Sequence, residues 1–414
     1  MPSDERTSPE SRFLARAASF EAMWRELEPI GAAATGGYER FAWTPADLEL
    51  RRWFLREGER RSMRTEQDRN GNLWAYWGGG DRCVATGSHL DSVPGGGAFD
   101  GPLGVVSAFL AVDELRARGA TPTRTIAVAC FADEEGARFS MPCVGSRLAT
   151  GVLAPEAARE LRDAGGVTLA EAMQDAGVDP GALGRDDERL AAIDAFVELH
   201  VEQGRSLAEL DAPVGLATAI WPHGRWRLEF SGEANHAGTT RLSDRHDPML
   251  PFATTVLAAR QVADLLGAHA TVGKAVAYPN ASNAVAARVD AWLDGRAGAP
   301  AVLEELVSRV AAEAQRACEA HGVGLELHRE SYSPEVGFES TLRRRIAAVL
   351  PEAPELPTGA GHDAGVLSVV LASAMLFVRN PTGVSHSPLE AAGTHDCLAG
   401  VVALADVLEE LGCR

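Results

Sequence analysis

Apolar and polar positions alternate in a way that predicts a regular order of strands and helices in the first part of the chain. Apolar residues recur at helical spacing over 11–28, and a second helix is predicted for 102–119, with proline at its start and glycine at its end. Short strands are predicted for 82–87 and 125–131, and the second is apolar throughout, as in a strand buried on both faces of a mainly parallel sheet. Strand, helix and strand at this spacing form a βαβ unit.

The middle of the chain has a different pattern, in which strands and helices follow the order β-α-β-β-α-β. The predicted elements of this part are, in order, 225–231, 248–266, 271–278, 288–293, 302–321 and 324–327. That order is typical of a split βαβ, ferredoxin-like sandwich. Elements of the first kind then resume, with a helix at 340–349, a strand at 374–378 and a helix at 397–411.

These patterns predict an α/β protein with two domains. A discontinuous domain with a mixed, mainly parallel sheet is expected to comprise residues 1–213 and 329–414. A ferredoxin-like α+β domain, 214–328, is expected to be inserted into it as a lid. The length of 414 residues agrees with this division, because a chain of that size is too long for one typical core.

Charge and composition exclude several classes of function. The chain has 39 Lys and Arg residues and 58 Asp and Glu residues, which gives a formal net charge of −19. No basic tract could neutralise phosphates, so we expect neither nucleic acid nor an anionic membrane as a partner. Residues 1–16 lack the apolar stretch of a secretory signal, and no apolar run is long enough to span a membrane. The six cysteines are scattered without a Cys-x-x-Cys pair, which predicts free thiols and a cytoplasmic location.

Histidines and carboxylates concentrate near the ends of predicted strands, where open α/β sheets bind their ligands. The segments that contain them are 87–91, 95–101, 133–136, 198–204 and 383–388. In the first segment, His89 and Asp91 share one face of a strand, so one could bind a metal while the other orients its partner. In the second, Asp100 lies in a glycine-rich stretch, and glycine allows the backbone to fold tightly around an ion.

The acidic triplet Asp133, Glu134 and Glu135 directly follows the buried strand. Of two adjacent carboxylates at a strand end, one can bind a metal ion while its neighbour acts as general base on metal-bound water. His200 and His386 each lie in a short apolar segment before a glycine or proline turn. Each feature alone is common in surface loops and at helix N-termini, but their coincidence indicates a metal site. Imidazoles and carboxylates without cysteine suit zinc, manganese, cobalt or nickel.

Seven motifs, taken in order, resemble those of the hydantoinase/carbamoylase amidases, within the metallo-aminoacylase clan of two-metal hydrolases. The resemblance extends from about residue 11 to residue 411. The motifs are Gly-Ser-His-Leu-Asp-Ser (87–92), Gly-Ala-Phe-Asp-Gly (97–101), Asp-Glu-Glu-Gly-Ala-Arg-Phe (133–139), Leu-His-Val-Glu-Gln-Gly (199–204), Asn-His-Ala-Gly-Thr-Thr (235–240), Gly-Ala-Gly-His-Asp-Ala (359–364) and Ser-His-Ser-Pro (385–388).

The resemblance implies a catalytic domain that holds two divalent metal ions, zinc or manganese, with cobalt or nickel also possible. Asp100 would bridge the two ions. His89 and His200 would complete the shell of one ion, and Glu135 and His386 that of the other. Which pair serves which ion is left open by the resemblance.

The same resemblance implies roles for residues around the ions. Glu134 would be the general base that deprotonates water and later protonates the leaving nitrogen, and Asp91 would orient His89. His236, in the lid, would stabilise the oxyanion in the site of a partner subunit, so the chain would form a homodimer and the lid would also be the dimerisation domain. His362 would lie near the site without an assigned role.

Three further positions match substrate contacts of that family. Gln203 and Asn283 would hydrogen-bond the substrate. Arg296 would bind its carboxylate, a task that suits the planar fork of arginine. Two departures from the family pattern affect substrate choice more than the metal ligands: Arg241 stands where proline is expected, and Gly295 where an apolar residue is expected.

The reaction implied is hydrolysis of a non-peptide C–N bond in a small linear ureide, an N-carbamoyl-L-amino acid or allantoate, with release of ammonia. Residues 220–226 resemble the corresponding stretch of allantoate amidohydrolases. Two alternatives stay open. One is an aminoacylase or dipeptidase of the same clan, in which the position of His200 is more often a carboxylate. The other is a non-catalytic binding protein, whose signature would be the loss of Glu134 or of a metal ligand.

Overall fold

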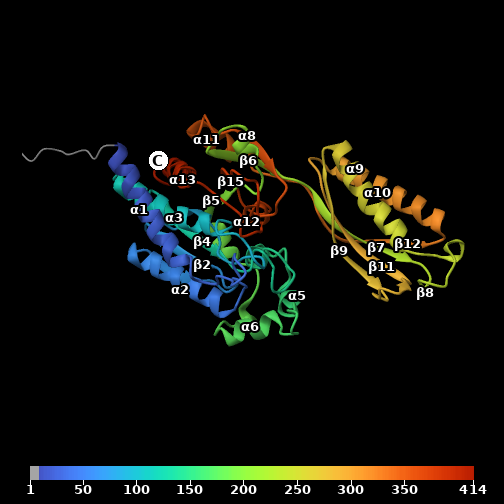
Figure 1. Cartoon of the computed structure of the whole chain (residues 1–414). Helices are drawn as coiled ribbons and strands as arrows, with labels where there is room; N and C mark the ends of the chain where they lie inside the picture. The colour runs from blue at the N-terminus through green and yellow to red at the C-terminus, as the bar shows by residue number, and fades with distance from the viewer. Residues whose placement is uncertain (1–8) are drawn as a thin grey trace, which may run out of the picture. The chain divides into compact units, whose positions relative to one another are not determined.

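The structure, a computed structural model, describes residues 9–414 and consists of two compact units (Figure 1). Unit 1 comprises the described residues up to Thr218 together with Phe338–Arg414, and unit 2 comprises Ala219–Gly337. Unit 2 is thus inserted in the sequence of unit 1. Unit 2 begins and ends later in the sequence than the inserted segment predicted above, 214–328. Its last long strand continues to Ser333.

The largest sheet has nine strands. They are β1 (Arg64–Gln67), β2 (Leu73–Trp77), β3 (Cys83–His89), β4 (Thr125–Phe131), β5 (Ile193–Val201), β6 (Val214–Ile220), β13 (Val336–Gly337), β14 (Glu355–Thr358) and β15 (Ser373–Val378). Their order is β1-β2-β4-β3-β5-β15-β6-β13, with β14 beside β6. The central strands β4, β3, β5 and β15 are parallel, and β2 and β6 flank them in the antiparallel direction. The predicted α/β fold with a mixed, mainly parallel sheet is confirmed.

Helices cover this sheet. They are α1 (Pro9–Leu27), α2 (Pro45–Arg60), α3 (Pro102–Ala117), α4 (Val144–Thr150), α5 (Pro155–Arg159), α6 (Leu169–Asp175), α7 (Asp187–Ala192), α8 (Ser206–Glu209), α11 (Ser340–Val349), α12 (Asp363–Leu367) and α13 (Thr394–Gly412), with a 3-10 turn at Pro180–Ala182. Helices α3 and α13 pack against each other and against the central strands, and α1 packs on both helices (Figure 1). Because α3 is apolar and buried on nearly every side, it forms the centre of the main core.

Two elements of the N-terminal part were not predicted from the hydrophobic pattern. Helix α2 appears polar in sequence, yet it buries Trp53 and Phe54 completely, and its buried Arg51 is neutralised by Asp47 at 2.8 Å. The hairpin of β1 and β2 adds two antiparallel strands to the edge of the parallel sheet. Each fully buried large apolar side chain contributes about 1.5–3 kcal/mol to stability, so this helix is held by tertiary packing more than by its own sequence pattern.

Unit 2 has a four-stranded antiparallel sheet with two long helices on one side (Figure 1). Its elements are β7 (His223–Ser231), β8 (Asn235–His236), a 3-10 turn at Leu242–Asp244, α9 (Met249–Leu266), β9 (His269–Tyr278), β10 (Ala284–Val285), β11 (Arg288–Arg296), α10 (Pro300–His321) and β12 (Gly324–Ser333). The sheet order β12-β7-β11-β9 and the helix connections give the predicted split βαβ arrangement. Its core joins Leu228 and Phe230 of the sheet to Leu303 and Leu306 of α10.

All six cysteines are free, as predicted, and five of them are buried. Cys318 lies in the core of unit 2, whereas Cys83, Cys130, Cys143 and Cys397 lie in unit 1.

Candidate metal centre and active site

The candidate ligands of unit 1 lie at the carboxyl ends of its parallel strands. His89 is the last residue of β3, and His200 is the last residue but one of β5. Residues 133–135 follow the end of β4, and His386 lies in the loop after β15. Sequence positions almost 300 residues apart are therefore brought to one edge of the sheet, as expected for an open α/β fold.

The first group of candidate ligands consists of His89, Asp100 and His200. The Oδ1 atom of Asp100 lies 3.6 Å from His89 Nε2 and 3.1 Å from His200 Nε2. All three side chains are buried, and their ligand atoms lie within 4.8 Å of one another. The residue after Asp100, Gly101, has φ +84°, and a Cβ there would lie 2.4 Å from the His89 ring. Glycine is therefore required where the chain passes this histidine.

The two imidazoles of this group fit a metal ion. Each Nδ1 faces a backbone oxygen, that of Asp91 at 3.1 Å for His89 and that of Val201 at 2.9 Å for His200. With the proton on Nδ1, the lone pair of Nε2 points inward, and both Nε2 atoms are buried without a hydrogen-bond partner. A buried polar atom without a partner is costly, and a cation held by two imidazoles and a carboxylate would satisfy both.

The second group consists of Asp100, Glu135 and His386. His386 Nε2 lies 3.4 Å from Asp100 Oδ2 and 3.6 Å from Glu135 Oε2. The adjacent Asp100 carboxylate raises the pKa of His386 to about 8, and burial raises the pKa of Glu135 to about 7. Since Oδ1 of Asp100 faces the first group and Oδ2 the second, a single carboxylate is shared by both.

Glu134 lies beside the first group. Its side chain is buried, with Oε2 3.7 Å from His89 Nε2 and Oε1 3.3 Å from the thiol of Cys143. Burial, with further contributions from Asp363 and Glu135, holds the pKa of Glu134 well above its usual range. A carboxylate with such a raised pKa is suited to take up a proton.

Asp91 has a different set of contacts from the predicted one. Its carboxylate Oδ1 lies 3.6 Å from His89 Nδ1, too far for a hydrogen bond, and the backbone oxygen of Asp91 orients the ring instead. The carboxylate accepts hydrogen bonds from the backbone N–H groups of Glu134 and Glu135, at 3.1 and 3.0 Å. Asp91 thus positions the acidic pair, a role that spacing along a strand could not indicate.

Two more side chains of the site were not assigned from the sequence. Glu198 is fully buried on β5, where it accepts hydrogen bonds from Ser88 Oγ at 2.7 Å and Ala364 N at 2.9 Å. His362 packs against His200 with ring centroids 4.5 Å apart, so it lies at the site as its motif implied. Glu198 lies two residues before His200, and that spacing was the available signal, since such residues share a strand face.

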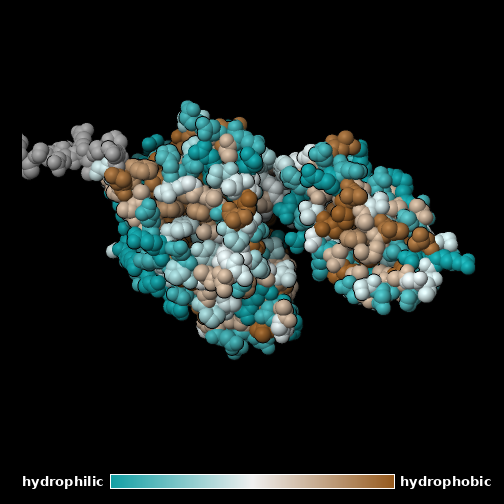
Figure 2. Space-filling view, viewed as in Figure 1, coloured by the Kyte–Doolittle hydropathy of each residue, from teal (hydrophilic) through white to brown (hydrophobic). Residues whose placement is uncertain are grey.

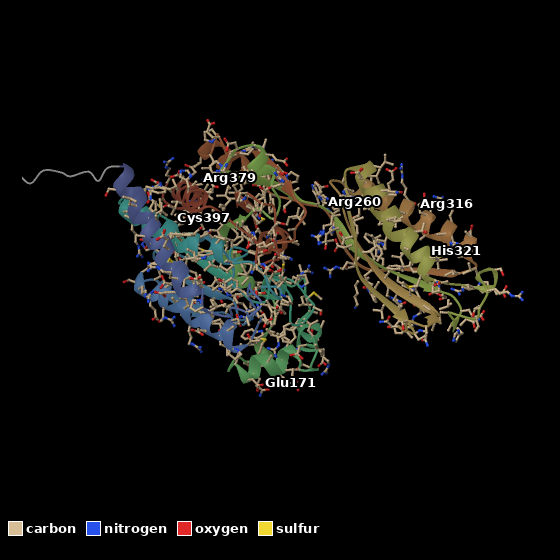
Figure 3. The ribbon with its side chains drawn as sticks, in the orientation of Figure 1. Glu171, Arg260, Arg316, His321, Arg379 and Cys397 are labelled. Atoms are coloured by element: carbon tan, nitrogen blue, oxygen red, sulfur yellow. The ribbon has the colours of Figure 1, made fainter. Side chains whose placement is uncertain are left out.

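The loop that contains His386 is anchored at both ends. Arg379, just after β15, forms a bidentate ion pair with Asp396 of α13, with both contacts at 2.8 Å. Arg379 and Cys397, which is next to Asp396, are labelled in Figure 3 and mark the two ends of the loop. His386 itself has φ +54° and a side chain that is 50% exposed. The histidine of the second group thus lies in a loop, whereas both histidines of the first group lie in strands.

The predicted substrate contacts fall into both units. In unit 1, Gln203 Nε2 donates to Asp100 Oδ2 at 2.7 Å, next to the second group. In unit 2, the short ladder of β8 and β10 brings His236 beside Asn283, and both are exposed. Arg296 ends β11, where its Nε donates to Asp294 at 2.8 Å and its side chain is about one-third exposed.

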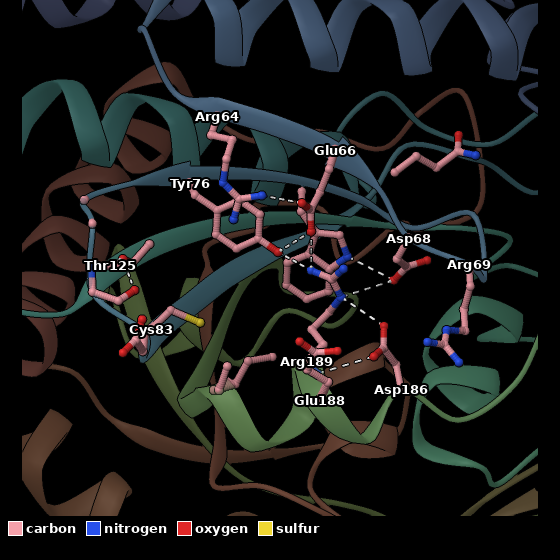
Figure 4. Close-up of a pocket in the computed structure, with 18 residues that line it drawn as sticks. Arg64, Glu66, Asp68, Arg69, Tyr76, Cys83, Thr125, Asp186, Glu188 and Arg189 are labelled. Carbon is pink, nitrogen blue, oxygen red and sulfur yellow. Dashed lines mark hydrogen bonds and ion pairs between the residues drawn. The ribbon is translucent and has the colours of Figure 1, made fainter.

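A cavity of about 710 Å³ in unit 1 contains none of the residues predicted for the site (Figure 4). It lies where β3, β4 and β5 begin, at the opposite ends of these strands from the candidate ligands. Arg189 is at its centre and is paired with Glu66 at 2.8 Å and Asp186 at 3.2 Å. No histidine of the described chain lines it, and Arg64 and Arg189 are both paired with Glu66, so the cavity offers no ligand set like that of the metal centre.

Comparisons with known proteins agree with this geometry. A family model described as peptidase family M20/M25/M40 matches residues 85–410. An N-carbamoyl-L-amino acid amidohydrolase of Geobacillus stearothermophilus is 36% identical over 398 residues, which cover 93% of this chain and 96% of that protein. An allantoate amidohydrolase of Bacillus subtilis (strain 168) is 33% identical over 396 residues, covering 93% and 95%. A solved amidase of the hydantoinase/carbamoylase family from Burkholderia multivorans superposes with a TM-score of 0.84 at 27% identity, covering 96% and 98%.

No helix within residues 9–414 combines the length and the apolar composition needed to cross a membrane.

The matched family model spans most of the chain, and the relatives match over nearly their whole length. The chain therefore belongs to peptidase family M20/M25/M40 and, within it, to the hydantoinase/carbamoylase amidases.

Proposed function

We propose that this protein is a metal-dependent amidohydrolase that cleaves a C–N bond of a linear ureide, allantoate or an N-carbamoyl-L-amino acid, with release of ammonia. The observation that carries the proposal is the single carboxylate of Asp100 shared by two groups of imidazole and carboxylate ligands, with the buried Glu134 beside them. The names of the two relatives, an N-carbamoyl-L-amino acid amidohydrolase and an allantoate amidohydrolase, support this substrate class.

The ligand set supports two divalent metal ions, zinc or manganese, with cobalt or nickel as alternatives. His89, His200 and Asp100 would hold one ion, and Asp100, Glu135 and His386 the other. Such ions, when bound, lower the pKa of water and polarise a carbonyl group.

The protein's own groups would carry the proton transfers. Glu134 takes a proton from the attacking water and delivers it to the leaving nitrogen, a cycle that its raised pKa favours. Asp91 holds the backbone of Glu134 and Glu135 in place during this cycle. The ureido carbonyl is thereby hydrolysed, and its terminal nitrogen leaves as ammonia.

Four residues would recognise the substrate. Arg296 binds the substrate carboxylate through its guanidinium group, Gln203 and Asn283 form hydrogen bonds with the substrate, and His236 stabilises the developing oxyanion. Arg296 donates from Nε and Nη2 to Asp294 on its own strand, which fixes the direction of the guanidinium group. Binding of a carboxylate by arginine is favoured by bidentate geometry.

The alternatives have less support. An aminoacylase or dipeptidase would share the metal centre, but both relatives reported above are named for ureide substrates. A non-catalytic binding protein would be expected to lack Glu134 or a ligand, whereas the chain contains all of them close together.

The test is ammonia release by the purified, manganese-loaded protein on a panel of substrates. The panel contains allantoate, several N-carbamoyl-L-amino acids, N-carbamoyl-β-alanine, an N-formyl and an N-acetyl amino acid, and a dipeptide, with amine release followed for the last three. We expect turnover of a ureide that a chelator abolishes and added metal restores. Turnover of only the acyl or peptide substrates would keep the metal centre and overturn the ureide assignment.

We propose a homodimer formed through unit 2, because the role given to His236 places this side chain in the active site of a partner subunit. Helix α9 supports it with an exposed apolar stripe: Leu250, Leu257 and Leu265 are 49%, 65% and 70% exposed. Figure 2 shows hydrophobic side chains gathered over this unit. Exposed leucines along one helix are typical of an interaction surface.

Leu257→Glu is therefore expected to convert a dimer into a monomer in light scattering. An unpaired carboxylate buried in an interface costs about 3 kcal/mol or more, which corresponds to about 100-fold weaker association. Leu14→Glu is the matched control, because Leu14 is 60% exposed but lies in unit 1. A wild-type monomer with full activity would show that His236 does not act across subunits.

A further inference from the structure

Glu390 is a buried carboxylate in the loop between β15 and α13, and one of its oxygens accepts from two backbone N–H groups. Its Oε2 accepts hydrogen bonds from Phe99 N at 2.8 Å and Asp100 N at 3.0 Å. The residue is 7% exposed, so its carboxylate is largely removed from water. Hydrogen bonds from backbone N–H groups stabilise a buried carboxylate, and these bonds in turn hold the backbone of Asp100.

Gly97 lies directly against the same side chain. A Cβ at this position would lie 2.2 Å from Glu390 Oε2 and 2.5 Å from Glu390 Cβ. Any residue other than glycine would displace Glu390. The glycine-rich stretch before Asp100 is thus shaped to admit this carboxylate.

Ser385 connects Glu390 to the second ligand group. Its Oγ lies 3.2 Å from Asp100 Oδ2 and 3.3 Å from Glu390 Oε1. A hydroxyl has one hydrogen, so it can donate to only one of these oxygens at a time. Ser385 directly precedes His386, so Glu390 contacts the backbone of Asp100 on one side and the His386 segment on the other.

The two ligand groups differ in how firmly their histidines are held. His89 and His200 lie within buried strands of the central sheet. His386 lies in a loop, with a left-handed backbone and a half-exposed side chain. The geometry between His386 and Asp100 thus depends on contacts between this loop and the stretch that contains Asp100, and Glu390 supplies two hydrogen bonds of that kind.

We infer that Glu390 is a positioning residue that fixes Asp100 relative to His386 and thereby sets the affinity of the second ligand group for its divalent ion. This inference rests on the metal centre proposed above and goes beyond its ligands. Replacing a residue that hydrogen-bonds to a metal ligand, without binding the metal itself, typically weakens metal affinity about 10- to 100-fold. Asp100 also belongs to the first group, but both histidines of that group lie in strands of the central sheet, so its ion is expected to lose less affinity.

The experiment measures metal binding and does not depend on the substrate. The full chain is stripped of metal and titrated with Mn²⁺ against a competing chelator, for the wild type, Glu390→Ala and Glu390→Gln. In Glu390→Ala we expect the second ion to bind about 10- to 100-fold more weakly, and the first ion to lose clearly less affinity than the second. In Glu390→Gln both ions should be retained, because one amide oxygen can accept from both N–H groups.

Glu339→Ala is the matched control. Glu339 also accepts two backbone N–H bonds in unit 1, from Thr341 at 2.9 Å and Leu342 at 2.6 Å, but it caps α11, away from the ligands. Its removal should leave both affinities unchanged. If Glu390→Ala does not fold, Gly97→Ala tests the same contact by displacing the carboxylate, and it should weaken the second ion in the same way.

The outcomes separate the inference from the proposed function. A wild-type chain that binds no divalent ion would overturn the metal centre itself. Two ions bound with wild-type affinity in both Glu390→Ala and Gly97→Ala would overturn the role of Glu390. Equal weakening of both ions would also overturn it, because Glu390 would then act on Asp100 alone or on the fold as a whole, and not on the contact between Asp100 and His386.

Discussion

The Glu134→Gln variant is expected to keep its metal ions and to lose turnover by about 10²- to 10⁴-fold, the usual contribution of a general base. Glutamine preserves the shape of the side chain but cannot take up a proton. The side chain is buried and lies 3.7 Å from His89 Nε2, so no water-exposed carboxylate can readily replace it. The measurement is the rate of ammonia release together with the metal content of the same sample.

The control for this prediction is Glu202→Gln. Glu202 is a buried carboxylate of the same unit that accepts backbone N–H bonds from Ser206 and Leu207, at 2.6 and 2.9 Å. Its replacement should leave kcat within about threefold, since it donates no proton to the reaction. Full turnover in Glu134→Gln would assign the proton transfers to another group, and loss of metal would make Glu134 a ligand.

Asp100→Ala is expected to lose both metal ions, whereas His386→Ala is expected to lose one. The difference follows from geometry, because Oδ1 of Asp100 faces His89 and His200 while Oδ2 faces His386. Without this carboxylate, two imidazoles remain for the first ion, and one imidazole and one carboxylate for the second. Structural and catalytic metal sites usually need at least three protein ligands.

Elemental analysis after dialysis gives the number of ions per chain for both variants. Ammonia release should be abolished in Asp100→Ala, and added metal should not restore it. His395→Ala is a suitable control, since His395 is an exposed histidine at the start of α13 that belongs to neither ligand group. One ion retained in Asp100→Ala would show that the two groups do not share this residue.

Hydrophobic patterning predicted the order of most long elements because it reports which faces are buried. It failed for α2, whose buried Arg51 and Glu57 are charged, and charged residues in a core leave no apolar period. The split βαβ unit was recognisable because its strands alternate with regular helices. The strand limits were less predictable, since β12 extends six residues beyond the stretch that its pattern indicated, to Ser333.

The candidate ligands could be named from motifs, and the structure brings them together in two groups. The contacts behind them could not be predicted. Asp91 and Glu390 accept hydrogen bonds from backbone N–H groups more than 40 residues away along the chain. Every residue except proline has such a group, so the sequence does not show which one a carboxylate will bind. Whether Arg296, Asn283 and His236 contact a substrate stays a prediction, because they lie in unit 2 and the ligand groups lie in unit 1.

The buried cysteines give each unit its own chemical probe. Burial raises the pKa of Cys318 to about 11 and that of Cys397 to about 12, so neither thiol reacts with an alkylating reagent while it stays packed. Reaction requires local opening, of the α10 core of unit 2 for Cys318 and of the α13 core of unit 1 for Cys397. The labelling rates of these two natural residues would therefore report the opening free energy of each unit separately, without an introduced label.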